Sequence, residues 1–286
     1  MPPKPKLPRP ARRSRPRAKP VRATARGRDT PGAGHTQALS RGLAVLEALA
    51  ATEGGATLTV LAEMLTLPAP TAHRLLATLE QAGYVQQGAG GEWLIGVRAF
   101  RVGSAFRDHR NLVVQAYPRL KRLMEESGET TNLAVTDDGE AVFVEQVQCR
   151  ELMRMSTKLG ARAPLHASGV GKAMLAAMAD GAVAATLAKR GLMRHTANTI
   201  VDRERLAAEL RTTRERGYAI DDEEHADGLR CVAAPIWDDN GEPWAAISLA
   251  GPTSRITIER IDELGRLVRT TADVITAALG GHPPRR

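Results

Sequence analysis

The chain has 286 residues, 43% of them hydrophobic and only 3% aromatic, with a formal net charge of +8. The length predicts two domains. No apolar run approaches the ~20 residues that span a bilayer and no apolar secretory signal is present, so we expect a cytoplasmic protein without membrane contact. The two cysteines, Cys149 and Cys231, form no C-x-x-C motif, which argues against a disulfide framework and a cysteine-based zinc site.

The positive charge is concentrated in the first 34 residues. They contain eleven Lys and Arg residues and a single acid, Asp29, whereas the other 252 residues carry 29 bases and 31 acids. Eight of the seventeen prolines also lie here, so residues 1–34 are expected to form a disordered basic tail. Such a tail adds sequence-independent contacts to DNA phosphates. The alternative is a solubilising extension without a binding role.

Residues 35–51 are predicted to form a helix with an apolar face at Leu39, Leu43, Leu46 and Ala50. Arg41 lies on the other side of this helix. There it either contacts a DNA phosphate or is simply solvated.

Residues 57–84 are predicted to form two short helices with a sharp break between them. Apolar residues recur at three- and four-residue spacing in each half, at Leu58, Leu61, Ala62 and Leu65 and then at Leu75, Leu76, Leu79 and Ala82. Pro68 and Pro70 separate the halves, because proline suits the first turn of a helix and not its interior. The outward face of the second helix carries polar or basic side chains, Thr71, His73, Arg74 and Thr78. This arrangement is typical of a helix-turn-helix that reads the DNA major groove, and the alternative is an ordinary helical hairpin.

The segment that follows favours the DNA-binding interpretation. Gly83 is placed to end the second helix, because glycine readily adopts the left-handed conformation. Residues 84–87 and 92–95 flank a glycine-rich turn and predict a small hairpin. A hairpin directly after a recognition helix is a wing. We therefore assign residues 35–97 to a DNA-binding domain.

Two further helices are expected before the second domain. Residues 97–108 are compatible with a linking helix, and residues 111–128 with another that Pro118 kinks or breaks. We place the linker at residues 98–115 and the second domain at residues 116–282.

The second domain mixes strands and helices without strict alternation, which predicts an α+β fold. Strands are expected at residues 132–135, 141–144, 152–156, 230–237 and 244–251, and helices at 171–179, 201–216 and 256–279. Turns at 137–139 and 238–241 join two pairs of these strands.

Three stretches of this domain are candidates for a ligand site. Residues 166–172 form a glycine-containing loop that opens a helix, where free backbone N–H groups favour an anion. The loop lacks the residues of a Walker A motif, and the alternative is a simple tight turn. Residues 221–231 hold acids and one histidine, a composition more typical of a solvated loop than of a metal site. The third stretch is residues 247–252.

Four segments of the chain resemble the IclR family of bacterial transcription regulators. They are SRGLAVLEAL, LTVLAEMLTLPAPTAHRLLATLEQAGYV, HASGVGKAMLA and DDEEHADGLRCVAAPI. The resemblance extends from about residue 36 to about residue 281, and within the family it is greatest to the acetate-operon (glyoxylate bypass) repressor type. It implies a winged helix-turn-helix domain, a linker helix and a GAF-like effector-binding domain. The expected partners are double-stranded operator DNA and further copies of the chain, in a homodimer or homotetramer.

The same resemblance implies an effector pocket, lined by Leu152, Met155, Gly169, Val170, Asp221, Cys231 and Ser248. Ala250 stands where such relatives have a second serine, and Val170 and Ala163 differ in size from their counterparts. The pocket should therefore be small and suit a short carboxylate or keto acid. Glyoxylate and pyruvate are the first expectations, and a regulator of aromatic-acid catabolism with the same fold is the alternative.

The chain departs from these relatives at the start of the predicted recognition helix. They often have a hydroxyl or amide residue where this chain has Ala69, and alanine is a poor helix N-cap. This leaves the operator sequence open.

Two other classes of protein compete with a regulator. An enzyme would use Cys231 as nucleophile with His166 or His225 as base, but Cys231 lies in an apolar strand, where a buried and inert thiol is the default. A basic DNA-binding protein that senses nothing would have no need of the mildly acidic second domain. We expect no catalytic group, cofactor or metal.

Overall fold

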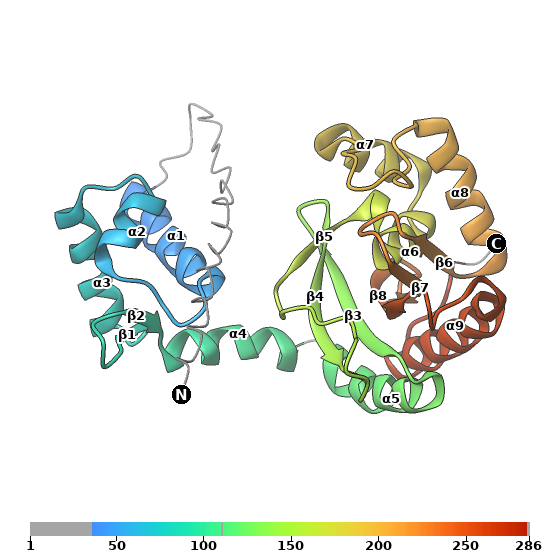
Figure 1. Cartoon of the computed structure of the whole chain (residues 1–286), viewed down its shortest axis with the longest axis horizontal. Helices are drawn as coiled ribbons and strands as arrows, with labels where there is room; N and C mark the ends of the chain where they lie inside the picture. The colour runs from blue at the N-terminus through green and yellow to red at the C-terminus, as the bar shows by residue number, and fades with distance from the viewer. Residues whose placement is uncertain (1–35, 110, 285–286) are drawn as a thin grey trace, which may run out of the picture. The chain divides into compact units, whose positions relative to one another are not determined.

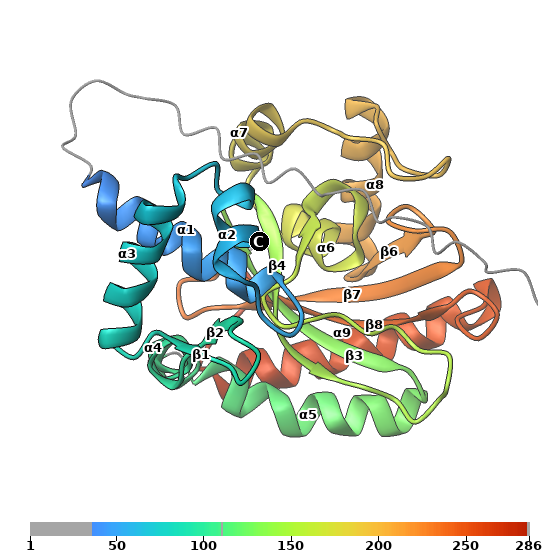
Figure 2. The same cartoon turned by 60° about the vertical axis from the view of Figure 1, so that its left-hand side comes forward.

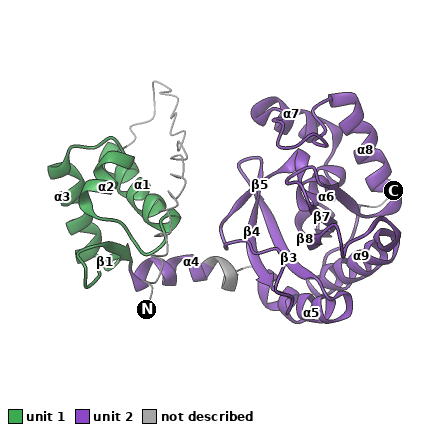
Figure 3. Ribbon diagram, viewed as in Figure 1, with its two compact units in different colours: residues 1–95 green, residues 96–286 purple. Residues whose placement is uncertain are grey.

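The computed structural model of the chain describes residues 36–109 and 111–284 (Figure 1). The described residues divide into two compact units, one ending at Ile95 and the other beginning at Gly96 (Figure 3). The predicted basic tail, residues 1–34, lies outside the described part. None of the described helices is long and apolar enough to cross a membrane.

The first unit consists of three helices followed by a two-stranded hairpin. They are α1 (Gln37–Ala51), α2 (Leu58–Met64), α3 (Ala69–Gln81), β1 (Val85–Gln87) and β2 (Trp93–Ile95). β1 and β2 pair antiparallel, and Ala56 adds a single bridge to Trp93. The core comprises Val45, Leu49, Ala56, Leu61, Leu76, Val85 and Trp93. The two predicted helices of the helix-turn-helix and the wing are therefore confirmed.

The predicted apolar face of α1 is wrong except at Leu46, which is half-buried and packs against the core. The buried residues are Gly42, Val45 and Leu49, whereas Leu39 is 64% exposed and Leu43 is 51% exposed. Both sets recur at helical spacing, because α1 is apolar around much of its circumference. Spacing alone could not identify the set that faces α2 and α3.

Local backbone geometry fixes both ends of α3. α3 ends in a Schellman motif, in which Gly83 adopts a φ of +77° and the N–H of Tyr84 donates to Leu79 O at 2.8 Å. α3 starts differently from our expectation. Its N-cap is Pro68, and Ala69 is the first helical residue.

The second unit is built on one antiparallel six-stranded sheet of order β5-β4-β3-β8-β7-β6. The strands are β3 (Thr130–Asp137), β4 (Glu140–Val147), β5 (Arg162–Pro164), β6 (Ala219–Asp222), β7 (Leu229–Trp237) and β8 (Pro243–Pro252). The helices are α4 (Val97–His109), α5 (Leu112–Ser127), α6 (Gly169–Ala177), α7 (Asp180–Arg190), α8 (Arg203–Arg216) and α9 (Ile261–Ala278), with single 3-10 turns η1 (Leu165–Ala167) and η2 (Ile258–Arg260).

Each face of the sheet is covered by its own helices. α5 and α9 lie side by side on one face, and α6 and α8 lie on the other (Figure 2). Two apolar cores result, one shared by α5, α9 and the sheet and the other by α6, α7, α8 and the sheet. The α+β prediction is confirmed, although α7 and the short strands β5 and β6 were not expected.

Two predictions for this unit need correction. Residues 152–156 form no strand, because they belong to a loop held by side-chain bonds rather than by a strand ladder: Arg154 donates to Gln148 Oε1 at 3.0 Å and to Glu151 O at 2.9 Å. α5 runs through Pro118 without a break. It also buries Leu112 and Val113 in the core of the second unit, so the domain boundary predicted at residue 116 falls within a helix.

Candidate functional site

The predicted DNA-binding residues of α3 lie on the side of the helix that faces away from the core of the first unit. Ala72 and Leu76 face the core, while His73, Arg74 and Thr78 are exposed and Thr71 is half-buried. The hydroxyl of Thr78 donates to Arg74 O at 2.8 Å, so its oxygen can accept but its proton is already used. Of the predicted DNA-binding residues, His73 and Arg74 therefore present the strongest donors. Arg41 of α1 is half-buried.

The start of α3 offers few backbone donors. The N–H groups of Thr71 and Ala72 donate to Pro68 O at 2.8 and 3.1 Å, and Pro70 has no N–H. A helix N-terminus normally binds a phosphate through such groups. Phosphate contacts at this end must therefore come mainly from side chains.

The second unit contains a cavity of about 300 Å³ on the α6 face of the sheet. It brings together six of the seven predicted effector residues, namely Met155, Gly169, Val170, Asp221, Cys231 and Ser248. Leu152 is the exception, because its side chain is 99% exposed at the tip of the loop after β4. The prediction that Leu152 forms an apolar wall of the pocket is therefore wrong.

Strand alternation explains why residues distant in sequence meet here. Side chains two apart on a strand share a face, and Ala219, Ala233 and Ala246 belong to the core beneath α6. Asp221 and Cys231, which are directly paired across β6 and β7, and Ser248 on β8 follow the same parity. All three therefore lie on the cavity side of the sheet.

The N-terminus of α6 forms another wall of the cavity. Ser168 caps the helix by accepting from the Gly171 N–H at 3.2 Å, and helix geometry leaves the N–H groups of Gly169 and Val170 outside the intrahelical ladder. A Cβ added at Gly169 would lie 3.1 Å from Cys231 Cβ, so glycine allows α6 to pack closely on β7. This is the anion-favouring geometry predicted for residues 166–172, but His166 itself points elsewhere and bonds Met193 O at 2.9 Å.

Asp221 is the most unusual polar group of the cavity. Its Oδ1 accepts from the backbone N–H groups of Glu224 at 2.8 Å and His225 at 3.3 Å, whereas Oδ2 has no hydrogen-bond partner among the described groups. Burial raises the pKa of Asp221 to about 7, with the nearby Glu224 carboxylate acting in the same direction. The carboxyl therefore changes charge near neutral pH.

Cys231 is buried next to Asp221. Burial first, and then the Asp221 carboxylate, raises the pKa of the thiol well above its usual value. The thiol is therefore neutral, and a thiol that does not ionise is a poor nucleophile. This geometry disfavours the enzyme alternative.

The sequence 221–231 is not the solvated loop that its acids suggested. Asp221 and Glu224 are both buried, and Glu224 forms an ion pair with Lys172 of α6, which is only 1% exposed. Lys172 Nζ also lies 3.9 Å from Glu209 Oε1. The same oxygen of Glu209 pairs with Arg216 Nη2 at 2.6 Å. Glu224 is tolerated inside the unit because this buried network balances its charge.

A buried amide network connects Ser248 with the loop after β4. Asn132 Nδ2 donates to Ser248 Oγ at 3.2 Å, and Gln146 Nε2 donates to Asn132 Oδ1 at 2.7 Å. Gln146 Oε1 then accepts from the Thr157 N–H at 3.3 Å. Asn132 and Gln146 were missed as site residues, although a fully buried asparagine in an apolar strand is itself an unusual feature.

The loop that carries Met155 is anchored at its far end by Arg255. The guanidinium of Arg255 pairs with the buried Glu129 at 2.7 Å and donates to Met153 O at 2.9 Å. This contact fixes the loop so that Met155 faces the cavity and Leu152 faces outward.

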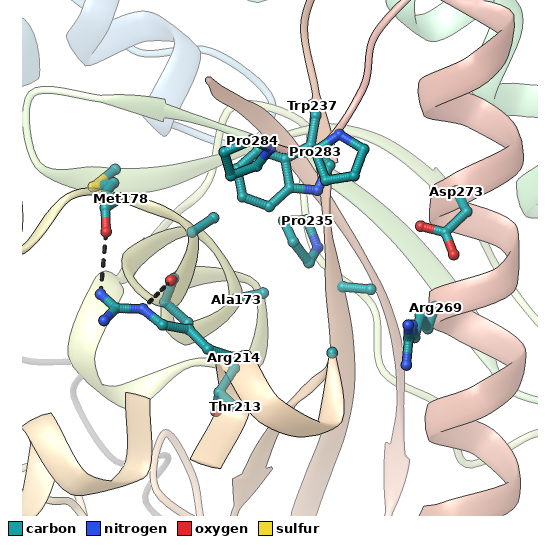
Figure 4. A pocket seen from close by; sticks show the side chains of 14 residues that line it. Ala173, Met178, Thr213, Arg214, Pro235, Trp237, Arg269, Asp273, Pro283 and Pro284 are labelled. Carbon is teal, nitrogen blue, oxygen red and sulfur yellow. Dashed lines mark hydrogen bonds between the residues drawn. The ribbon is translucent and has the colours of Figure 1, made fainter. Parts of the chain in front are cut away.

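A second cavity of about 300 Å³ lies elsewhere in the same unit, near the ends of α6 and α8 and against β7 and α9 (Figure 4). Arg214 donates to Ala176 O at 2.6 Å and to Met178 O at 3.1 Å, and so caps the end of α6. Arg269 and Asp273 line the opposite side. None of the predicted site residues lies here.

Comparison with known proteins assigns both units to the same group. Residues 38–89 match the IclR helix-turn-helix domain, and residues 105–277 match the C-terminal domain of the bacterial transcriptional regulator IclR. The chain is 50% identical over 277 residues to the transcriptional repressor IclR of Escherichia coli, a match covering 96% of this chain and 98% of that protein. It is 48% identical, with the same coverage, to the acetate operon repressor of Salmonella typhimurium.

A solved structure shares the arrangement of elements. The crystal structure of an IclR homologue from Microbacterium hydrocarbonoxydans, in complex with 4-hydroxybenzoate, matches with a TM-score of 0.77 at 26% identity. The match covers 85% of this chain and 98% of that one.

Proposed function

This chain belongs to the IclR family of bacterial transcriptional regulators, and we propose that it represses an acetate-type metabolic operon in response to glyoxylate or pyruvate. Its relatives are DNA-binding repressors and not enzymes. The exposed polar face of α3 binds the operator, with Arg74 and His73 as the main donors to base edges and phosphates. Two or four copies of the chain dock on a pseudo-palindromic site, in the cytoplasm.

One observation supports the effector assignment most strongly. The cavity places a free helix N-terminus opposite Ser248 and Asp221, with Met155 as an apolar wall. This combination suits a short ligand that has a carboxylate at one end and a carbonyl or small apolar group at the other. Ala250 has no hydroxyl, so the hydroxyl that β8 offers to the ligand is that of Ser248.

The runner-up effector is an aromatic acid. The structurally similar Microbacterium protein was solved with 4-hydroxybenzoate, which keeps a regulator of aromatic-acid catabolism as the alternative. Both effectors carry a carboxylate, so they differ in the apolar part that Met155 and Val170 must accommodate. A DNA-binding protein that senses nothing is disfavoured by a cavity with this polar lining.

A combined binding test distinguishes these effectors. Glyoxylate, pyruvate and 4-hydroxybenzoate are titrated against the purified chain by thermal shift and against its operator complex by gel shift, since a ligand selective for the folded state raises the melting temperature. Ser248→Ala is expected to weaken glyoxylate binding roughly tenfold through loss of one hydrogen bond, while operator binding without ligand stays unchanged. Ser254→Ala, at an exposed serine just after β8, is the matched control. An unchanged response in Ser248→Ala would show that the ligand binds elsewhere, and a shift with 4-hydroxybenzoate alone would replace the proposed effector.

A further inference from the structure

Asp221 poses a problem for a cavity that binds a carboxylate. The residue is 1% exposed and lines the cavity, and its Oδ2 has no partner among the described groups. An ionised Asp221 next to a ligand carboxylate would place two negative charges together in a poorly solvated space. Such pairs are strongly disfavoured unless one of the two groups is protonated.

The surroundings of Asp221 do not supply a cation that solves this problem. Lys172, the buried lysine of α6, is already paired with Glu224, and Arg230 on the neighbouring strand pairs with Asp222 at 2.6 Å. The titratable and charged groups on the elements that pack around β6 are Lys172 of α6, Glu209 of α8, Arg230 and Cys231 of β7, Glu223, Glu224 and His225 of the loop after β6, and Lys158 and Arg162 at the cavity rim.

Burial outweighs the groups that favour an ionised Asp221, which are the backbone N–H groups of Glu224 and His225 and the charge of Lys172. The Glu224 carboxylate raises the pKa of Asp221, and burial lowers the pKa of His225, so that this imidazole is uncharged near neutrality. Cys231 is a neutral thiol and at most a weak donor. Arg162 is engaged with Asp137 and Glu140.

We propose that the cavity takes up its carboxylate ligand together with one proton, which is held on Oδ2 of Asp221 and donated to the ligand in a hydrogen bond. The Asp221 carboxylate, a proton from solvent and the ligand carboxylate form one O–H···O⁻ pair, and no covalent bond to the ligand is made or broken. Oδ1 keeps the two backbone hydrogen bonds from Glu224 and His225 that orient the carboxyl group. This proposal rests on the proposed function, because it requires an anionic effector.

Proton uptake has a measurable consequence for affinity. Below the pKa of Asp221, about 7, the carboxyl group is already protonated and binding takes up no proton. Above it, binding takes up close to one proton, and the dissociation constant rises about tenfold for each pH unit by linkage. A ligand bound only by the α6 N-terminus and Ser248 would show neither effect.

The test is isothermal titration calorimetry of the full chain with glyoxylate and with pyruvate. Titrations at pH 6 and at pH 8 are run in two buffers of different ionisation enthalpy, because the dependence of the observed heat on buffer enthalpy counts the protons exchanged. We expect almost no proton uptake at pH 6, uptake approaching one proton at pH 8, and about tenfold weaker binding at pH 8. Pyruvamide, the neutral analogue of pyruvate, is expected to bind without this pH dependence.

Two variants separate Asp221 from its neighbours. Asp221→Asn keeps the acceptor for the two backbone N–H groups and replaces O–H by a permanent N–H donor, so it should bind glyoxylate with the same affinity at pH 6 and pH 8 and without proton uptake. Asp222→Asn makes the same chemical change one residue away, at a partly exposed carboxylate paired with Arg230, and should retain the wild-type pH dependence.

The possible outcomes are distinguishable. Binding of glyoxylate or pyruvate that is equally tight at pH 6 and pH 8 and releases or takes up no proton would overturn the proton-coupled mechanism while leaving the effector assignment intact. Full pH dependence in Asp221→Asn would overturn it as well, by assigning the proton to another group. No binding of either acid at any pH, in a chain that still binds its operator, would overturn the effector assignment and this proposal with it.

Discussion

At the scale of single residues, three buried polar atoms without partners lie close together in sequence, and two of their residues, Asp221 and His225, line the effector cavity. Asp221 Oδ2, Glu224 Oε2 and His225 Nδ1 all lack a hydrogen bond among the described groups, and each such atom costs roughly 1–3 kcal/mol. They lie within the five residues 221–225, which begin in β6 and continue into the loop after it. A ligand that pairs with Asp221 would therefore offset this cost.

The stability of the protein should depend on Asp221 and on pH. The folded-state pKa of about 7 lies above the ordinary value of an unfolded aspartate, so the folded chain holds a proton that the unfolded chain releases between about pH 4 and pH 7. The free energy of unfolding contributed by this group is thus highest below pH 4 and is lost as the pH rises towards 7.

We expect Asp221→Asn to remove this loss. The variant should be more stable than the wild type at pH 8, by up to about 4 kcal/mol for a shift of this size, and nearly equal to it at pH 4. Urea unfolding at the two pH values measures the difference, with Asp222→Asn as the matched control. Equal stabilisation at both pH values would mean that Asp221 is not the group that titrates.

At the scale of elements, the turn between α2 and α3 contains a residue in a strained conformation. Thr66 adopts a φ of +54°, and the N–H groups of Thr66 and Leu67 donate to Glu63 O and Ala62 O at 3.2 and 2.9 Å. This is a Schellman ending of the kind that Gly83 makes in α3, but here it is built on a β-branched residue. The left-handed conformation costs such residues on the order of 1–2 kcal/mol.

Thr66→Gly should therefore stabilise the N-terminal unit, by about 1 kcal/mol after the greater entropy of an unfolded glycine is subtracted. Ala77→Gly is the control, because it places a glycine at an exposed position inside α3, where the backbone is helical. It should lower the stability of the same unit by about 1 kcal/mol. Differential scanning calorimetry of the full chain measures both changes. A lower melting temperature in Thr66→Gly would show that the threonine side chain makes a compensating contact.

The elements also show what could be predicted from the sequence and why. The sequence predicts α2, α3 and the wing correctly. Their signals, which are proline, glycine and helical spacing, depend only on residues close to one another in the sequence. The segment 152–156 looked like a strand locally, yet strand formation requires a partner, and Arg255 and Gln148 hold this segment instead. β6 was missed because its two acids read as a solvated loop, and only the folded chain brings Lys172 to Glu224 and Arg230 to Asp222.

The effector residues were predicted by resemblance rather than by physical pattern. Asp221, Cys231 and Ser248 lie on three strands, and the spacing between them in sequence indicates nothing about their proximity. The prediction that Leu152 lines the pocket was wrong for a related reason. A position transferred by resemblance does not tell in which direction a loop side chain points. Asn132 was overlooked because its strand appeared to be an ordinary apolar strand, although its hydrogen bonds position Ser248.

At the scale of the whole molecule, charge is divided unequally along the chain. The first 34 residues carry eleven bases and one acid, whereas the remaining 252 residues carry 29 bases and 31 acids. The chain after residue 34 therefore has a slightly negative net charge, which repels DNA at long range. Attraction to the operator must come from local donors such as Arg74 and from the basic N-terminal segment.

These two sources should be separable by their salt dependence. Each phosphate neutralised by a base contributes about one unit to the slope of log affinity against log salt, so removal of residues 1–34 is expected to reduce that slope by several units and to weaken operator and random DNA alike. Arg74→Ala should reduce the slope by about one unit or less and weaken operator binding by about 1–3 kcal/mol, with little effect on random DNA.

Fluorescence anisotropy over a range of salt concentrations measures both quantities, and a chain in which the eleven bases of residues 1–34 are replaced by glutamine controls for tail length. Operator and random DNA must be compared at the same salt, because affinity for both falls as salt rises. An unchanged slope in the truncated chain would identify residues 1–34 as a solubilising extension, since bases that release no counterions make no phosphate contacts. Loss of operator preference on truncation, with Arg74→Ala indistinguishable from wild type, would instead move sequence recognition from α3 to the N-terminal segment.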